Sequence, residues 1–196
     1  MSTVVCQTLA GPTSGDHANK VMVENGHSLV DAQGNPIGRK LLNFYSVTKN
    51  DTQTHSAFQT WTEITDLSIT LTPFSASSKF YITGHINLSW DAGQAKGAID
   101  FVRDGTPPSG SIGVVAGNRI QVHSIFYTNS QGGVPFNHSI NFYDSPNTTS
   151  QITYTPRFRN MDPQGIVGIN YCPEIDTDSN LFARTVSTFT VMEIGA

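Results

Sequence analysis

Residues 80–90 constrain this chain most, because apolar and polar side chains alternate there over eleven residues. One face holds Phe80, Ile82, Ile86, Leu88 and Trp90, with Gly84 among them. The opposite face holds only Tyr, Thr, His, Asn and Ser. A period of two places alternate side chains on opposite faces of a β-strand. We therefore expect a strand here with one buried face.

Further strand-like runs follow one another along the chain, separated by turn residues. They cover residues 41–49, 61–72, 98–103, 120–126, 136–142, 152–158, 166–171 and 184–194. No convincing helical pattern interrupts them. Roughly eight to ten short strands of this kind predict an all-β sandwich or barrel, of which the jelly roll has about eight strands in two sheets.

The last run, residues 184–194, is apolar on both faces. Val186, Met192 and Ile194 lie on one face, and Phe189 and Val191 on the other. A strand that is apolar on both faces has to be covered on both. In a chain of this size we expect another subunit to supply the second cover.

The composition agrees with a β-protein. Only 13% of the residues are charged, against roughly 25% in an average soluble domain. The chain holds instead 22 Thr, 19 Ser and 14 Asn, which suit pleated surfaces and turns. Hydrophobic residues make up 37%, which is enough for a core and argues against disorder.

Charge and hydropathy exclude several function classes. The net charge is −4 and no basic run is present, so the electrostatic signature of a nucleic-acid binder is missing. No apolar run approaches the ~20 residues of a membrane helix, so we expect no membrane insertion. The first ten residues lack the basic and apolar regions of a signal peptide. We therefore expect assembly in a host cytoplasm.

Residues 1–40 differ from the rest of the chain. Short strand-like pieces at 2–9, 20–23 and 28–30 alternate with dense turn chemistry. Strands this short cannot bury a core alone. We expect the segment to become ordered by docking, either onto copies of itself or onto a larger particle. The chain thus divides into an N-terminal attachment segment, 1–40, and one domain, 41–196.

Several motifs, taken in their order and spacing, resemble a known family over nearly the full length. They are Val47–Thr52, Trp61–Pro73, Ser77–Ile82, Asp144–Ser150 and Arg184–Ile194, together with the opening Met1-Ser2-Thr3 and the stretch Ala18–Val23. In these features the chain is similar to the small tail-fibre-type virion proteins of cyanophages and other aquatic phages. The resemblance implies a C1q- or tumour-necrosis-factor-like jelly roll that assembles as a homotrimer.

The resemblance also implies partners and a location. In such a trimer the apolar residues of the last strand would form the interface: Val186, Phe189, Val191, Met192 and Ile194. Residues 1–40 would bind other phage proteins of the tail or capsid, which places the chain in the virion. Two roles stay open, a short tail fibre for host attachment and a capsid decoration (cement or head-fibre) protein at threefold positions. The missing coiled coil, collagen-like repeat and β-helix shaft add weight to decoration.

No catalytic motif is present, neither His-Glu-x-x-His nor Gly-x-Ser-x-Gly nor a phosphate-binding loop. We therefore expect no enzyme activity, no cofactor and no metal. Two weaker alternatives are histidines gathered on a trimer axis (His85, His123, His138) and a calcium-binding loop at 174–180. We interpret these as ordinary interface residues and a solvated turn. Cys6 and Cys172 are expected to be isolated thiols.

Recognition is expected on loops, because loops on a rigid sandwich are where binding usually occurs. The candidates lie in 91–95, 104–110 and 129–133, with Asp91, Gln94, Asp104, Asn129 and Gln131 as the polar side chains. Small polar residues and glycines suit weak contacts to a host-surface glycan, which three copies would strengthen through avidity. A secreted C1q-like ligand is a third possibility. The missing signal sequence and the few cysteines argue against it.

Overall fold

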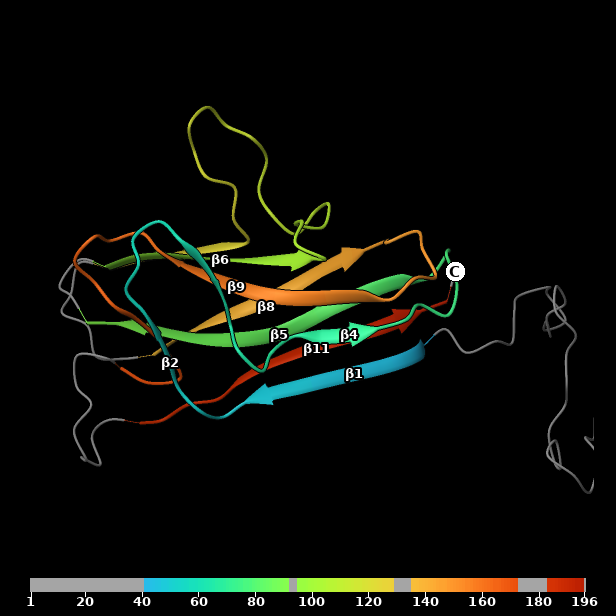
Figure 1. Ribbon diagram of the computed structural model, residues 1–196, viewed down its shortest axis with the longest axis horizontal. Helices are drawn as coiled ribbons and strands as arrows, with labels where there is room; N and C mark the ends of the chain where they lie inside the picture. The colour runs from blue at the N-terminus through green and yellow to red at the C-terminus, as the bar shows by residue number, and fades with distance from the viewer. Residues whose placement is uncertain (1–40, 92–94, 129–134, 173–182, 196) are drawn as a thin grey trace, which may run out of the picture. The chain divides into compact units, whose positions relative to one another are not determined.

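The computed structural model describes residues 41–91, 95–128, 135–172 and 183–195, and in these ranges it consists of β-strands and loops with no helix (Figure 1). The strands are β1 (Leu41–Lys49), β2 (Gln53–His55), β3 (Trp61–Glu63), β4 (Ile69–Leu71), β5 (Lys79–Trp90), β6 (Ala95–Arg103), β7 (Ser124–Thr128), β8 (Phe136–Asp144), β9 (Ile152–Asn160), β10 (Val167–Ile169) and β11 (Ser187–Ile194). Residues 1–40 lie outside this description, so the predicted division at residue 40 stays a prediction.

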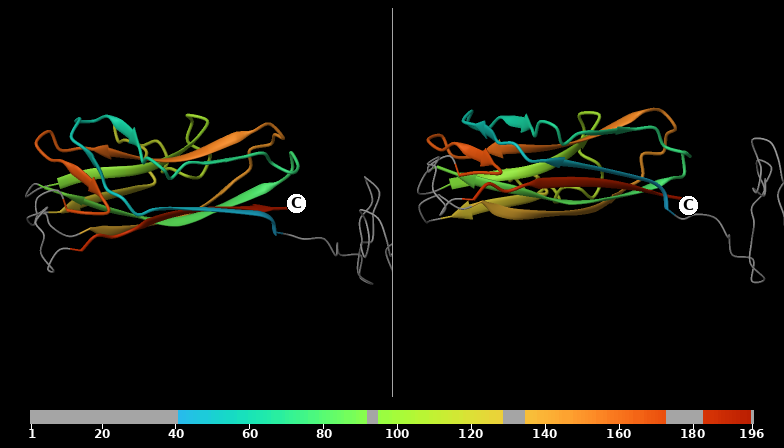
Figure 2. Two further views of the ribbon diagram at one scale, coloured as in Figure 1. Left: turned by 60° about the horizontal axis from the view of Figure 1, so that its bottom comes forward. Right: turned by 90° about the horizontal axis from the view of Figure 1, so that it is seen from below.

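Two antiparallel sheets face one another (Figure 2). The first has the order β1-β11-β5-β10-β2, with β8 along the other edge of β5. Because β11 pairs with Lys79–His85 and β10 with Leu88–Trp90, these two strands follow one another along a single edge of β5. The second sheet has the order β3-β9-β6-β7, and β4 joins β3 along one edge of β9.

The chain crosses between the sheets repeatedly. It passes from β2 to β3, from β4 to β5, from β5 to β6, from β7 to β8, from β8 to β9, and from β9 to β10. All pairings between the named strands are antiparallel. Repeated crossing of this kind makes a jelly-roll sandwich. The predicted all-β jelly-roll sandwich is thereby confirmed, while the homotrimer stays a prediction.

Aromatic and branched side chains fill the space between the sheets. The alternation in β5 is confirmed, since Phe80, Ile82, Ile86 and Leu88 are completely buried. The Phe101 ring of the second sheet lies 5.3 Å from Phe142 and stacks at 5.8 Å on Phe189, both of the first sheet. Inward-facing positions of two twisted sheets interdigitate in this way in sandwich folds.

Two details depart from the predicted strands. The run at 120–126 does not form one strand, because Val122 bonds across a loop, where its carbonyl accepts from the amide of Gly113 at 3.1 Å. The strand β7 begins only at Ser124. The strand β2 was not predicted, since its three residues are polar and show no apolar alternation.

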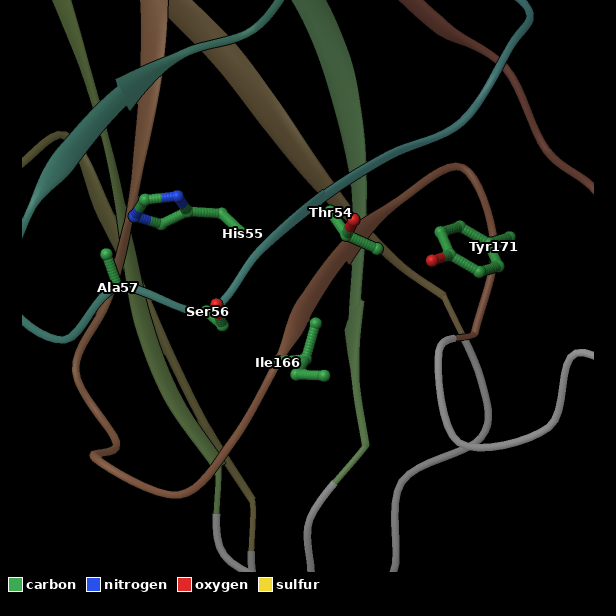
Figure 3. Close-up of a pocket in the computed structure, with 6 residues that line it drawn as sticks. All are labelled: Thr54, His55, Ser56, Ala57, Ile166 and Tyr171. Carbon is green, nitrogen blue, oxygen red and sulfur yellow. The ribbon is translucent and has the colours of Figure 1, made fainter.

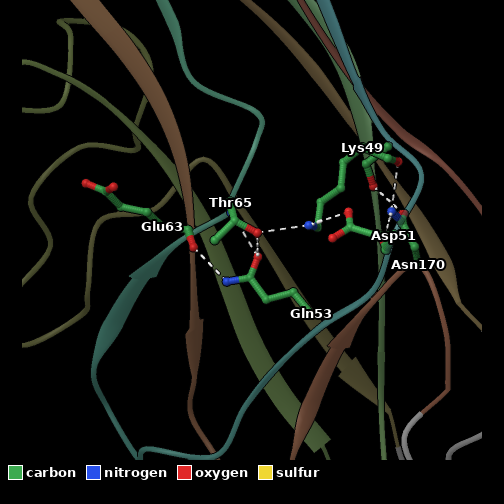
Figure 4. A network of polar contacts seen from close by, with 7 residues as sticks. Lys49, Asp51, Gln53, Glu63, Thr65 and Asn170 are labelled. Carbon is green, nitrogen blue, oxygen red and sulfur yellow. Dashed lines mark hydrogen bonds and ion pairs between the residues drawn. The ribbon is translucent and has the colours of Figure 1, made fainter.

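A polar network ties the end of β1 to three other segments (Figure 4). The Lys49 side chain is completely buried, and its Nζ donates to Asp51 Oδ1 at 2.7 Å and to Thr65 Oγ1 at 2.9 Å. That hydrogen bond lowers the pKa of Asp51. Asn170, just after β10, donates from Nδ2 to the carbonyls of Lys49 and Asp51, both at 2.9 Å. The network therefore fixes the chain where it leaves the first sheet.

Two buried acids, Asp100 in β6 and Asp144 at the end of β8, also have partners. Arg157 donates to both carboxylate oxygens of Asp100, at 2.9 and 2.6 Å. Asp144 accepts from Arg103 and, at 2.7 Å, from the phenol of Tyr154. Burial raises the pKa of Tyr154 well above its ordinary value, so the phenol stays protonated and remains the donor.

Candidate interaction surfaces

The predicted interface strand divides its residues between two environments. Phe189 and Val191 of β11 face the other sheet and are completely buried within one chain. Their cover comes from their own chain, so the prediction that they contact another copy is corrected: they are core residues. Met192 and Ile194 point to the opposite side and are partly exposed, and Val186, just before the strand, is exposed. For these three the interface stays a prediction.

The outward face of the sheet formed by β1, β11, β5 and β8 carries a row of large apolar side chains. The register places Phe44 beside Met192, Met192 beside Tyr81, and Tyr81 beside Tyr143. We call these four residues the aromatic row. Phe44 and Tyr143, at its two ends, are 60% and 64% exposed. A row across four strands presents a continuous apolar band to solvent.

Leu41 and Ile194 add apolar surface beside the row, and the rest of this face is polar and nearly uncharged. Its remaining outward positions hold Thr, Ser, Asn, His85 and a single formally charged residue, Lys79. Several of the polar groups bond to one another. Asn141 Oδ1 accepts from Tyr81 at 2.7 Å and from Thr83 at 3.1 Å, and the hydroxyls of Ser46 and Thr190 lie 2.9 Å apart. When the polar groups of a face are already hydrogen-bonded to one another, covering that face costs less desolvation free energy.

A separate pocket lies at the end of the sandwich where β2 and β10 pair (Figure 3). It has a volume of about 340 Å³ and is lined by Thr54, His55, Ser56, Ala57, Ile166 and Tyr171. In Figure 3 the hydroxyl of Tyr171 points into the space beside Thr54. None of these lining side chains is a carboxylate, a lysine or an arginine. The pocket therefore suits a neutral ligand with hydroxyl groups and an apolar face.

Buried hydrogen bonds hold the walls of this pocket. Asn160 donates from Nδ2 to the carbonyls of Ser56, at 3.3 Å, and Gly165, at 2.5 Å. Asp91 Oδ1 accepts from the amide of Ile166 at 2.5 Å. Both walls are thus fixed to β9 and to the end of β5. The pocket is preformed, which lowers the entropic cost of binding.

The predicted recognition residues do not form one group. Asp91 holds Ile166 in place, as described above. Asp104 lies at the opposite end of β6, has a φ of 50°, and accepts from the amide of Thr153 at 2.8 Å. Both are turn residues with structural bonds. Gln94, Asn129 and Gln131 lie outside the described residues, so their role stays a prediction.

The three histidines considered for a trimer axis do not share a face. His85 lies on the outward face of β5, where its Nε2 is 3.2 Å from the carbonyl of Val186. His123 and His138 turn inward, with their rings 5.0 Å from Phe101 and 5.5 Å from Phe126. Gathering of all three on one axis is therefore excluded by the fold.

The structure describes one of the two cysteines and does not describe the acidic loop. Cys172 is a free and buried thiol, while Cys6 and the acidic loop 174–180 lie outside the described residues. Among the described residues no group of three or more His, Cys, Asp or Glu side chains could hold a metal ion.

The same described ranges contain no helix long and apolar enough to cross a membrane.

Sequence reasoning missed both the aromatic row and the pocket. The row had a detectable signal, because strands 41–49 and 136–144 place Phe44 and Tyr143 on the face opposite their core residues. The pocket had none. Its polar residues are brought together by β2, which is too short and too polar to show a periodic pattern.

Comparisons with known proteins give little further information. No family model matches the chain, and no curated protein matches it. Among solved structures it is similar to VP2 of infectious bursal disease virus in its subviral particle, with 12% identity and a TM-score of 0.36 over 94% of this chain and 50% of that one. Structures of the Gt and Gx strains of that virus give TM-scores of 0.34 and 0.32 at the same identity. The chain spans about half the length of these proteins, and a likeness this remote says nothing about what it binds.

Proposed function

We propose that this chain is a structural protein of a virion surface, displayed as a homotrimeric knob that serves as a short tail fibre for host attachment. Three things support the proposal. They are the resemblance of the sequence to phage tail-fibre-type proteins, the jelly-roll fold, and the outward face that carries the aromatic row. The face is the observation that carries it.

The face has the chemistry of a permanent interface. Interface cores are enriched in Tyr, Phe and Met and are depleted of charge. The aromatic row supplies those residue types, and Lys79 is the one formal charge on the outward positions of the four strands. A monomer in water would leave this continuous apolar band uncovered. Three copies whose faces surround a common axis would cover it.

The pocket at the end of the sandwich is the proposed site of host recognition. Its hydroxyl groups, imidazole and uncharged lining match a neutral sugar. Sugars present an apolar ring face that packs on aromatic side chains such as Tyr171, together with hydroxyls that hydrogen-bond. Weak binding in one pocket would be strengthened by the three copies of the pocket in one trimer. Residues 1–40 would join the trimer to the particle.

Adsorption tests the attachment role. The purified full-length protein should compete with phage for host cells, and Tyr171→Ala should compete at least tenfold less well at equal folding. A matched control is Tyr127→Ala, which removes an exposed tyrosine of β7, away from the pocket. No competition by the native protein at saturating dose would reject host attachment.

Copy number separates attachment from capsid decoration. Decoration is the alternative role, favoured by the lack of a coiled coil, a collagen-like repeat or a β-helix shaft in this sequence. A quantitative gel of purified virions should show a few dozen copies or fewer per particle. Hundreds of copies would instead establish a decoration protein and overturn the tail-fibre proposal.

A further inference from the structure

The loop between β6 and β7 carries an apolar tip into solvent. Val114 and Val115 are 88% and 76% exposed, the two most exposed large apolar side chains of the loop. We call this pair the valine knob. In Figure 1 the loop rises above β6, away from the body of the sandwich. An exposed valine pair of this kind costs free energy unless something covers it.

Hydrogen bonds join the segment that precedes the valine knob to the segment that follows it, and they hold the loop in one conformation. At its base the amide of His123 donates to the Ile99 carbonyl at 2.9 Å, and His123 Nδ1 donates to the Ser111 carbonyl at 2.8 Å. Further out, Gly113 and Val122 are joined at 3.1 Å, as described above, and Gln121 Nε2 donates to the Gly113 carbonyl at 2.7 Å. The loop therefore presents the knob in a defined position.

An uncharged hollow lies on the opposite flank of the sandwich, between β1 and β4. Its volume is about 460 Å³, and its lining consists of Phe44, Tyr45, Ser46, Val47, Ser68, Ile69 and Thr70. We call it the β1–β4 groove. In the described sheets β1 pairs only with β11, and β4 only with β9, so each strand has a free edge here. Phe44, one end of the aromatic row, opens onto it.

The knob and the groove cannot meet within one chain. The loop leaves the flank formed by β7 and β8, whereas the groove lies at β1 and β4, on the far side of both sheets. Figure 1 shows the loop at the top and β1 at the bottom. Complementary patches on opposite flanks pair head to tail between copies, and such a contact either closes a ring or runs on as a filament.

We propose that the valine knob of one copy seats in the β1–β4 groove of the next, closing a ring of three. This rests on the proposed trimer and names the surfaces that hold it together. Neither the two valines nor the side chains that line the groove carry a formal charge, so their contact desolvates no ion. The seated knob would also cover Phe44. With flank against flank around the ring, the aromatic rows would surround the threefold axis.

Engineered cysteines test the contact in the full-length chain. Val115→Cys and Ser46→Cys are combined in one chain that also carries Cys6→Ser, and the protein is oxidised gently. We expect covalent dimers and trimers on a non-reducing gel. A mixture of the two single variants should give dimers and no trimers, because each chain then has only one half of the contact. The pair Val115→Cys and Asn137→Cys, with the second cysteine on β8, is the matched control and should not cross-link.

The outcomes are distinguishable. Cross-linking of Val115→Cys alone would mean that two knobs meet, and would overturn the head-to-tail contact. A covalent ladder beyond three copies would overturn the closed ring. If sedimentation shows a trimer but the cysteine pair does not cross-link, the knob contact is wrong while the proposed trimer stands.

A second variant measures the strength of the contact. Val114→Ser with Val115→Ser keeps the loop length and removes only apolar surface. We expect the dissociation constant of the trimer to rise at least tenfold in sedimentation equilibrium. An unchanged constant would overturn the role of the knob.

Discussion

Gly84 is the position where a single added carbon should do most damage. It lies mid-strand in β5 with a φ of 154°, and a Cβ there would sit 2.1 Å from the carbonyl oxygen of Thr188 in the neighbouring strand. Backbone atoms of a paired strand cannot move aside without breaking the sheet. We expect Gly84→Ala to lower the free energy of unfolding by roughly 2–4 kcal/mol in denaturant titration.

A second glycine provides the control. A Cβ at Gly113 would meet nothing closer than the Val122 carbonyl oxygen at 4.0 Å. Gly113→Ala should therefore stay within about 0.5 kcal/mol of the native protein. Equal losses for the two variants would contradict the steric explanation.

His138 should make the domain sensitive to mild acid. It faces inward from β8, its Nε2 is buried with no hydrogen-bond partner among the described residues, and burial lowers its pKa. The unfolded chain therefore binds the proton more readily than the folded one. The stability contribution of neutral His138 is complete above the unfolded pKa, about 6.5, and falls as the pH drops below it.

The measurement compares unfolding midpoints at pH 7.5 and pH 5.5. The native protein should lose stability on acidification, and His138→Gln should lose measurably less because it has no proton to gain. Between pH 7.5 and 8.5 the imidazole is neutral in both states, so the two proteins should respond alike there. An acid response that the substitution leaves unaltered would assign the effect to other groups.

At the scale of elements, Asn170 holds β10 against its neighbours. Its Nδ2 donates to the carbonyls of Lys49 and Asp51, and its Oδ1 accepts from Ser187 Oγ at 2.7 Å. Its backbone has a φ of 64°, which is unfavourable for most residues other than glycine. Asn170→Ala would remove three buried bonds and keep the strained backbone. We expect a loss of about 3 kcal/mol in the free energy of unfolding.

Asn170→Gly separates the two causes. Glycine also removes the three bonds but accepts a positive φ at little cost. It should be about 1 kcal/mol more stable than the alanine variant in the same denaturant titration. Identical stabilities would show that the side-chain bonds account for the whole effect.

The sequence was most informative where strands are long and one face is buried. The bounds of β1 agree with the predicted 41–49, and those of β5, β8 and β9 differ from their predicted ranges by one or two residues. The apolar alternation gave a wrong strand around Val122, where hydrogen bonds within the loop take the place of pairing with a neighbouring strand. It also failed for the three-residue strand β2, whose pairing with β10 depends on contacts distant in sequence.

At the scale of the whole molecule, the prediction that the last strand has two apolar faces is correct. The prediction that residues of both faces contact another subunit is too broad. Its inward residues Phe189 and Val191 belong to the core of the chain, and only its outward residues are open to a partner. A sequence shows that a strand has two apolar faces. It does not show which face the second sheet covers, because that depends on the order of strands in space. The aromatic row becomes visible only when four strands lie side by side.

The exposed aromatic row should make the thermal stability of the protein depend on its concentration. If copies of the chain cover one another's outward faces, unfolding also dissociates the assembly, and the Tm must rise with protein concentration. We expect the native Tm to rise by several degrees when the protein concentration is raised from about 1 to about 100 µM. Phe44→Ser with Tyr143→Ser should flatten this dependence, since it removes both exposed ends of the row. Phe74→Ser is the matched control, because Phe74 is 76% exposed but lies in the turn before β5, outside the row. A concentration-independent Tm for the native chain would mean that the apolar face is uncovered in solution, and the covering partner would then have to be another protein of the particle.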